Sequence, residues 1–397
     1  MTGAEVEARR RIAERGPITF AEFMEVALYW PDGGYYMTRQ PFGAEGDFTT
    51  APLTHPVFGA LLARQLRTLW RALGLPQPFG VLEAGAGTGR LAADIVAHAP
   101  LLDSAFGAAL TYLAFDRRPS PRPSPTGGGG LNSPPLGEMP EGQRGHRVVL
   151  ANELIDAMPV HRVTVDIGEL REVYVGAAQD GRFVEALGAP STPALAERLA
   201  AVGAHLSEGY RAEINLGLRQ WMEWAFGAIA SGYLLLIDYG HEAAVYYDEP
   251  RRRGTLRCYA GHTVGMDPYV RVGRQDIGAH VEFTSLRAAA RAAGFAEAGS
   301  MDQRELLRGL GLDAYRRQIA ERPDLGRAAR KANLERIDAL AAPDGMGSFR
   351  ALLFAKDAPA EGLLGAASGS AGPAPLPGAG HLPVPGAPPP TWEELLR

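Results

Sequence analysis

The chain has 397 residues, of which 46% are hydrophobic and 21% are charged, and its formal net charge is −5. This balance is typical of a globular protein with one large or two medium domains, and the small negative charge argues against a nucleic-acid surface. The single cysteine excludes an internal disulfide and a cysteine-based zinc site, and it suits a reducing compartment.

The N-terminal segment, 1–55, is predicted to be helical and then irregular. Its opening sequence, MTGAEVEARRRIAERG, mixes acids with bases and lacks the apolar run of a signal peptide. The longest apolar runs, such as YLLLI at 233–237, are too short to cross a bilayer. We therefore expect a cytoplasmic protein without a membrane-inserted segment.

A strand, a glycine turn and a helix are predicted around the sequence FGVLEAGAGTGR at 79–90. The strand ends in Glu83, and the turn contains Gly85, Gly87 and Gly89. Glycine is needed where the backbone takes a positive φ or touches a ligand, and dinucleotide sites space it as G-x-G-x-x-G. The G-x-G-x-G spacing after an acid is instead typical of enzymes that use S-adenosylmethionine (SAM). A tight turn without a ligand is the alternative.

The next strand is predicted from Leu110 to Phe115 and ends in Asp116, a candidate acceptor for both hydroxyls of a ribose. The segment 117–144 follows at once and is rich in proline and glycine. Proline lacks a backbone donor and glycine is costly to order, so this segment is predicted to form neither helix nor strand. Because strands of one sheet flank it, we place it inside the catalytic domain, 56–356.

Further apolar strands are predicted at 148–151, 233–237 and 348–356. Their near-continuous apolar sequence indicates strands covered on both faces, so the fold class is α/β with a doubly wound sheet. Segment 160–230 is predicted to begin as two strands around Gly168 and to continue as helices, and 302–345 is predicted to be helical. The tail, 357–397, is rich in Ala, Pro and Gly and is predicted to be disordered.

Several motifs follow one another along the chain: Gly-Tyr-Tyr at 34–36, Gly-Asp-Phe-Thr-Thr at 46–50, EAGAGTGRLAADI, ANELIDAMPV, LLIDYG and DIGAHVEFTSL. Together they resemble the MidA-like family of SAM-dependent methyltransferases. The resemblance implies a Rossmann-like SAM-methyltransferase sheet with the strand order 3-2-1-4-5-7-6, an N-terminal helical segment, an inserted helical and β subdomain, and SAM as cofactor. Mitochondrial members of the family are complex I assembly factors that methylate arginine. The resemblance thus also implies a protein substrate, a subunit of an NADH:quinone oxidoreductase.

The chain departs from the family pattern at three places. Gly278 stands where the family has threonine, and Asp116 stands where it tends to have glutamate. The segment 117–144 replaces a helix and the third strand, which is an edge strand in the family. Loss of an edge strand removes no central pairing.

An arginine acceptor is a planar cation, which needs carboxylates in bidentate contact. Just past the strand at 148–151, the sequence NELID offers Glu153 first and Asp156 second for this role. Asn152 is a candidate to bond the amino-acid part of SAM or the acceptor. The alternative role of Asp156 is to cap the turn before Pro159.

Asp47 and Thr49 are candidates to bind the methionine end of SAM, with an Asx-turn as the alternative for Asp47. Tyr35 and Tyr36 are predicted either to cover the SAM site or to pack on the core. For His280 and Asp276 we favour a structural role, with orientation of a substrate as the alternative. The scattered histidines show no metal-ligand spacing, so no metal is expected.

Three functions remain open from the sequence. The first is a protein arginine N-methyltransferase, which the intact Glu153 and Asp156 favour. The second is a non-catalytic complex I assembly factor with a degraded SAM site, which the Pro/Gly segment favours. The third is a methyltransferase for a small molecule.

Overall fold

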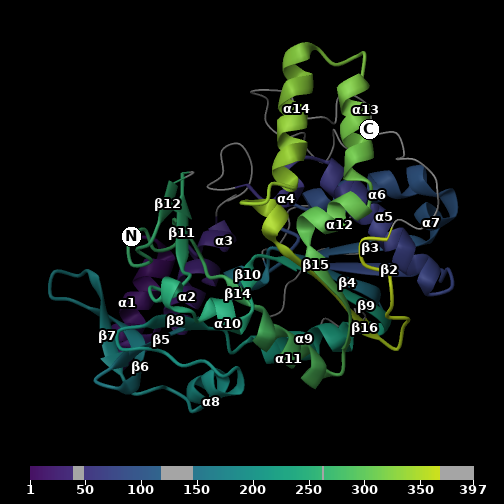
Figure 1. Ribbon diagram of the computed structural model, residues 1–397. Helices are drawn as coiled ribbons and strands as arrows, with labels where there is room; N and C mark the ends of the chain where they lie inside the picture. Colours follow the sequence, from purple (N-terminus) through teal and green to yellow (C-terminus); the bar gives the residue numbers. More distant parts are fainter. Residues whose placement is uncertain (39–48, 118–145, 262, 367–397) are drawn as a thin grey trace.

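The computed structural model describes residues 1–38, 49–117, 146–261 and 263–366 (Figure 1). Some sequence-based expectations lie outside the described residues. They are the role of Asp47, the conformation of all but the first residue of the segment 117–144, and the disorder of the tail from residue 367 onward.

A six-stranded sheet forms the centre of the larger part of the molecule (Figure 1). Its strands are β2 (Phe79–Ala84), β3 (Leu110–Phe115), β4 (His146–Asn152), β9 (Ile229–Asp238), β15 (Ala296–Asp302) and β16 (Arg350–Lys356). The spatial order is β15-β16-β9-β4-β2-β3. Strands β3, β2, β4 and β9 are parallel, and β16 runs antiparallel to both β9 and β15. The described strands follow the predicted methyltransferase order. Strand 3 of that order corresponds to residues between β3 and β4, of which 118–145 are not described.

Alternate side chains of these strands divide between two hydrophobic cores. Val81, Leu150 and Leu235 point to the core that contains α5 (Val57–Ala72) and α6 (Arg90–Leu102). The adjacent residues Leu82, Val149 and Leu234 point to the core that contains α9 (Leu218–Ala228) and α11 (Phe283–Ala293). Figure 1 shows these helices on opposite faces of the sheet. Burial on both faces explains the apolar runs, and the doubly wound α/β fold is confirmed.

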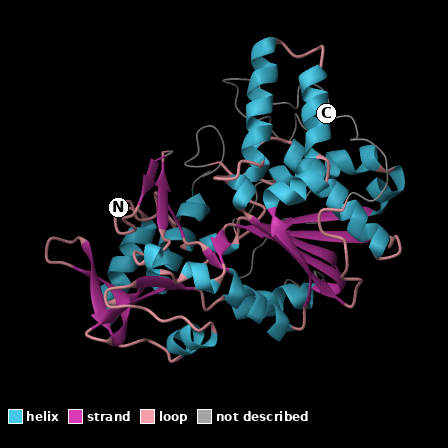
Figure 2. Ribbon diagram, viewed as in Figure 1, coloured by secondary structure: helices cyan, strands magenta, loops and turns pink. Residues whose placement is uncertain are grey.

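The N-terminal helices pack with the inserted strands and not on the central sheet. Helices α1 (Gly3–Arg15) and α2 (Phe20–Tyr29) share a core with residues of the insertion, such as Val160 and Val175. The connecting strand β1 (Ile18–Thr19) pairs with β6 (Glu169–Ala177) in a second sheet, which Figure 2 shows beside the central one. That sheet also contains β5 (His161–Asp166), β7 (Phe183–Gly188) and β8 (Arg211–Ile214). The N-terminal segment and the inserted segment 160–230, which we predicted as separate parts, thus contribute strands to one sheet.

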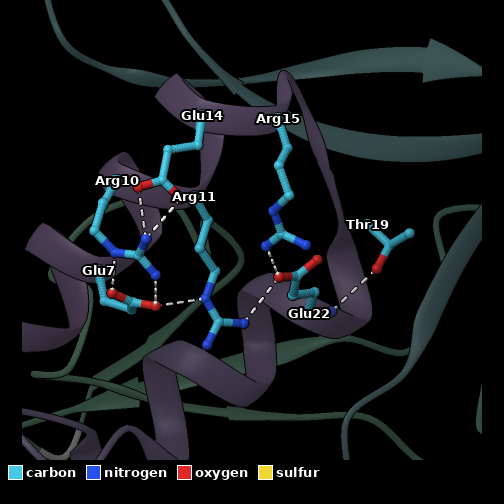
Figure 3. Close-up of polar contacts among 7 residues, drawn as sticks. All are labelled: Glu7, Arg10, Arg11, Glu14, Arg15, Thr19 and Glu22. Atoms are coloured by element: carbon cyan, nitrogen blue, oxygen red, sulfur yellow. Dashed lines mark hydrogen bonds and ion pairs between the residues drawn. The ribbon is translucent and has the colours of Figure 1, made fainter.

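Guanidinium and carboxylate groups on α1 and α2 form a continuous network (Figure 3). Arg10 Nε and Arg11 Nε donate to the two oxygens of Glu7 at 2.8 and 2.7 Å. Arg11 also reaches Glu22 at 2.8 Å, and Arg15 pairs with the same carboxylate. The network therefore ties the last turns of α1 to the first turn of α2.

Two segments of secondary structure differ from the sequence-based expectation. Strands β7 and β8 lie in the part of 160–230 that we predicted as helices, and β15 was not predicted. The four residues of β8 are too few to show a strand period, and its pairing with β5 decides its conformation. Strand β15 lies at the sheet edge and has the sequence AEAGSMD, which is mostly small and polar, so it lacks the apolar run of a buried strand.

The start of the expected tail is also ordered by packing. Gln65 Nε2 donates to the carbonyl of Leu363 at 2.9 Å, and Thr68 Oγ1 donates to the carbonyl of Ala366 at 2.8 Å. Leu364 is buried in the core beside α5. Residues 357–366, which we predicted to be disordered, are therefore packed against the core, because two leucines supply apolar surface that the Ala/Pro/Gly composition hides.

The remaining elements connect these parts. The other helices are α3 (Tyr35–Thr38), α4 (Ala51–Thr54), α7 (Ser104–Ala109), α8 (Ala194–Ala201), α10 (Ala243–Tyr246), α12 (Gln303–Gly309), α13 (Leu312–Glu321) and α14 (Arg327–Leu340), with short 3-10 turns η1 (Ile155–Ala157), η2 (Glu249–Arg251) and η3 (Met346–Ser348). The short strands are β10 (Gly240–His241), β11 (Arg257–Ala260), β12 (Thr263–Gly265), β13 (Asp276–Gly278) and β14 (Val281–Glu282). Within the described ranges, no helix is both long and apolar enough to span a membrane.

Candidate functional site

The glycine turn lies at the carboxyl ends of β2 and β3. Gly85, Gly87 and Gly89 have φ values of 74°, 53° and 74°. A side chain at Gly85 would also place its Cβ 2.7 Å from Leu154 Cδ1. The backbone N–H of Gly87 donates to Asp116 Oδ2 at 2.8 Å, so the predicted ribose acid lies against the turn. Positive φ at alternate residues turns backbone N–H groups toward one side, which suits the anionic end of a nucleoside-type ligand.

Glu83 lies below this turn, inside the sheet. Tyr112 in β3 donates its hydroxyl to Glu83 Oε2 at 2.9 Å. Burial raises the pKa of Glu83 to about 8. This acid contacts the neighbouring strand and is buried.

Glu153 and Asn152 form the first part of the segment that follows β4. Glu153 has a φ of 49°, and its backbone N–H donates to the carbonyl of Ile237 at 2.8 Å. Its Oε1 accepts from the backbone N–H of Ala51 and from Asn152 Nδ2, both at 2.9 Å. Burial raises the pKa of Glu153 to about 7. Glu153 therefore links β4 to α4, two residues beyond the exposed Thr49.

Asn152 also presents a buried acceptor. Its Oδ1 makes no hydrogen bond among the described residues. A buried polar atom without a partner costs free energy unless a ligand or water completes it. Asn152 Oδ1 thus fits a donor such as the amino group of SAM.

Asp156 lies on the 3-10 turn η1, which Asp238 caps. Asp238 Oδ2 accepts from the backbone N–H groups of Leu154 and Ile155 at 3.2 and 2.9 Å. Asp238 therefore caps the start of this turn, whereas the backbone N–H groups of Asp156 and Ala157 act on the carboxylate of Asp156, whose predicted alternative role as a cap before Pro159 stays a prediction. Asp156 Oδ2 accepts from the hydroxyl of Tyr239 at 2.5 Å, and Oδ1 is buried without a hydrogen bond in the described part of the chain. Burial raises the pKa of Asp156 to about 6.

A second aspartate comes to the same place from β13. Tyr36 donates its hydroxyl to Asp276 Oδ1 at 2.7 Å, and its ring stacks on Tyr29 with centroids 5.5 Å apart. Burial raises the pKa of Tyr36 and of Tyr239 well above the usual value, and the charges of both aspartates add to the effect. We call Asp156, Asp276, Tyr29, Tyr36 and Tyr239 the acid–tyrosine cluster.

Gly278 allows β13 to approach this cluster. A Cβ at this position would lie 3.1 Å from Tyr239 Oη and 3.5 Å from Asp156 Oδ2. The glycine that replaces the threonine of the family thus leaves room beside the Tyr239–Asp156 pair. His280 follows with its ring edge-on to Tyr239 at 5.3 Å, and burial lowers its pKa to about 4.

Sequence reasoning missed several members of this site. A structural role was favoured for Asp276 over an alternative role in orienting a substrate, Tyr239 was noted only as a residue at the end of a strand, and Tyr29 was not singled out. Asp238 and Tyr239 end a buried strand, a position that signals ligand contact in an open α/β sheet. Tyr29 carries no local signal, because it reaches the site from a helix that packs with the insertion.

Comparison with known proteins agrees with the geometry. A family model described as "Putative S-adenosyl-L-methionine-dependent methyltransferase" matches residues 61–124 and 134–301. The mitochondrial protein arginine methyltransferase NDUFAF7 homolog of Drosophila melanogaster is 30% identical over 310 residues, which are 71% of this chain and 68% of that protein. Mitochondrial protein arginine methyltransferase NDUFAF7 of Mus musculus is 30% identical over 380 residues, which are 86% of this chain and 82% of that protein.

A solved structure is similar over nearly the whole chain. It is a "likely methyl transferase" from Burkholderia thailandensis bound to S-adenosyl-homocysteine, with a TM-score of 0.77 and 30% sequence identity. The match covers 92% of this chain and 94% of that chain.

One expectation from the sequence is contradicted by these relatives. We expected a cytoplasmic protein, but the curated relatives are mitochondrial. The expectation rested on composition and on the first residues, neither of which reports a compartment reliably.

The positive-φ glycine turn, the aspartate against it and the unpartnered Asn152 Oδ1 fit SAM, and the family match agrees. The chain belongs to the family of S-adenosyl-L-methionine-dependent methyltransferases, and SAM is its cofactor.

Proposed function

We propose that the chain is a protein arginine N-methyltransferase. The observation that carries this proposal is the acid–tyrosine cluster. Asp156 and Asp276 are 8% and 4% exposed, and each accepts a hydrogen bond from a tyrosine hydroxyl. The relatives named as protein arginine methyltransferases support the same acceptor.

The cluster has the chemistry that a guanidinium group requires. A guanidinium is planar, carries five donors and pairs with carboxylates, and it also stacks on aromatic faces. Asp156 Oδ1 is a buried acceptor without a hydrogen bond in the described residues, and the rings of Tyr29 and Tyr36 lie stacked beside Asp276. Burial that raises a carboxyl pKa is offset when a cation binds, so this site favours a cationic acceptor.

The cofactor side of the site would bind SAM. SAM supplies an activated methyl group on a sulfonium. We propose that the turn at Gly85, Gly87 and Gly89 together with Asp116 holds it, with Asn152 at its amino-acid end. Asp47 and Thr49 stay candidates for that same end, and Glu83 supports the turn from the sheet interior.

The acceptor side would be held by different residues. We propose Asp156 and Asp276 as the guanidinium ligands, with Asp156 Oδ1 accepting the proton that the acceptor nitrogen releases. Glu153 ranked first from the sequence, but its Oε1 already accepts from Ala51 and Asn152. We therefore propose that Glu153 positions Asn152 and α4. A subunit of an NADH:quinone oxidoreductase, which the family resemblance implies as substrate, remains a prediction.

The proposal is tested by methyl transfer from labelled SAM to paired peptides that differ only in arginine or lysine at the central position. We expect label on the arginine peptide, assigned by mass spectrometry to a guanidinium nitrogen, and none on the lysine peptide. Label on lysine, or SAM binding in calorimetry without transfer to any arginine peptide or protein, would refute it.

A further inference from the structure

We propose that the three-stranded sheet β12-β11-β13 is the docking surface for the acceptor protein. It would bind a large apolar side chain of an extended segment, a few residues from the methylated arginine. This inference rests on the proposed function, because it starts from the acid–tyrosine cluster. We call Tyr259, Val264 and Met266 the docking strip.

The strand register places this strip in line with the cluster. Tyr259 in β11 lies opposite Asp276 in β13 and also opposite Val264 in β12. Directly opposed residues of antiparallel strands point to the same face of a sheet. A row therefore runs from Asp276 through Tyr259 to Val264.

The other face of this sheet is already occupied. Cys258 and Ile277, which alternate with the row above, are buried in the core shared with α1 and α2. The sheet is thus fixed from behind, and the row with Asp276 is the face left toward the acid–tyrosine cluster. The charges of Asp276 and Asp156 contribute to raising the pKa of Tyr259, after burial, which agrees with that placement.

The outer end of the row is apolar and exposed. Val264 is 59% exposed, and Met266, two residues further on, is 58% exposed. The loop behind them is held in place, because Tyr269 packs edge-on against Phe20 with centroids 6.1 Å apart and Gln275 Nε2 donates to the carbonyl of Asp267 at 2.8 Å. Clustered apolar side chains on a fixed loop are typical of an interaction site. Figure 1 shows the β11–β12 hairpin beside α3, which carries Tyr36.

The strand spacing defines the partner. Neighbouring strands lie about 4.8 Å apart, so Val264 is roughly 10 Å from Asp276 along the row. An extended segment in the polyproline II conformation advances about 3.1 Å per residue and has about three residues per turn, so side chains three residues apart point to the same side. An acceptor with its arginine at Asp276 would therefore place a side chain on Val264 about three residues away. The occupant we infer is an extended segment with a leucine, isoleucine, valine or methionine at that distance.

The test compares two peptides that carry one arginine and either leucine or serine three residues from it. We measure KM for methylation, and we measure Kd by fluorescence anisotropy with S-adenosyl-homocysteine present, so that binding is read without turnover. Wild type should favour the leucine peptide about tenfold in both measurements, the effect expected for burying one large apolar side chain.

The double variant Val264→Ser/Met266→Ser should reduce that preference to less than twofold. Ile167→Ser is the matched control, since Ile167 is 89% exposed at the turn between β5 and β6, and it should keep the tenfold preference. Thermal melts should show that both variants remain folded.

The outcomes separate the two proposals. Equal KM and Kd for the two peptides in wild type, or an unchanged preference in the double variant, would overturn the docking surface even if arginine is methylated. A leucine-dependent Kd without methylation would instead support the docking surface and refute the proposed function.

Discussion

The network on α1 and α2 and the acid–tyrosine cluster use the same carboxylate chemistry in opposite ways. In the network, Glu7 accepts from Arg10 and Arg11, and the hydrogen bond from Arg10 lowers the pKa of Glu7 to about 2 (Figure 3). In the site, burial raises the pKa of Asp156 to about 6 and that of Glu153 to about 7. The first set of carboxylates has its guanidinium partners within the chain, whereas the second has tyrosine hydroxyls and amide N–H groups.

This difference separates a structural region from a binding region. A carboxylate paired with a guanidinium favours the folded state at neutral pH, because the pair is made only there. A buried carboxylate without a cation disfavours it, since the charged form has lost water. A protein can keep a buried carboxylate of this kind where a bound ligand offsets the lost hydration, and a cationic acceptor offsets it. Three changes test this comparison.

The largest effect is expected from Asp156→Asn, which keeps the shape but removes the charge. The rate constant kcat/KM for an arginine peptide should fall by at least ~100-fold, because both cation binding and proton acceptance are lost. The free energy of unfolding should rise at pH 8, by roughly 1–3 kcal/mol, because a buried charge is removed. Steady-state kinetics and chemical denaturation measure the two quantities. Retained activity, or a loss of SAM affinity of equal size, would place Asp156 outside the acceptor site.

The next effect is expected from Glu7→Gln in the network. Loss of the charge weakens the hydrogen bonds from Arg10 and Arg11, so the free energy of unfolding should fall by about 2 kcal/mol. Methylation kinetics should stay within about twofold of wild type, because Glu7 belongs to α1 and does not contact the acid–tyrosine cluster. Glu14→Gln is the control, because Glu14 is half exposed and, among the described residues, forms an ion pair with Arg10 only. Equal destabilisation by both substitutions would show that the carboxylate of Glu7, which two arginines share, contributes no more to stability than that of Glu14.

The smallest effect is a dependence on pH between 5.5 and 8. The KM for an arginine peptide should fall about tenfold as pH rises through 6, because Asp156 loses its proton while the acceptor guanidinium stays charged. Asp156→Asn should weaken this dependence. A KM that does not change with pH in wild type would show that the raised pKa of Asp156 plays no part in acceptor binding.

Stability should change with pH in opposite directions for the two regions. The raised pKa values of Asp156 and Glu153 mean that the folded state holds more protons than the unfolded state from about pH 4 to 7, so their contribution falls as pH rises through that window. The lowered pKa of Glu7 means that its contribution is present above about pH 4.5 and is lost as pH falls toward 2.

The sequence by itself determined five of the six described strands of the central sheet and placed the residues that we propose for the cofactor side of the site. The strand before the glycine turn, the strand that ends in Asp116 and the apolar strands after it all carry local patterns, because each buries both faces or ends in a polar residue. Residues such as Gly87 and Asp116 lie together for the same reason, since parallel neighbours end at one edge of the sheet.

Only the tertiary structure decided the acceptor side. Tyr36 and Asp276 are separated by 240 residues, and Tyr239 and Asp156 by 83 residues, yet each pair makes a hydrogen bond. No local period reports such contacts, because they depend on how α2, α3 and β13 pack against the inserted strands. The same packing places a tyrosine hydroxyl against Asp156, whereas Glu7 has two arginines. The partners of a buried carboxylate determine its charge, and the residue type alone does not reveal them.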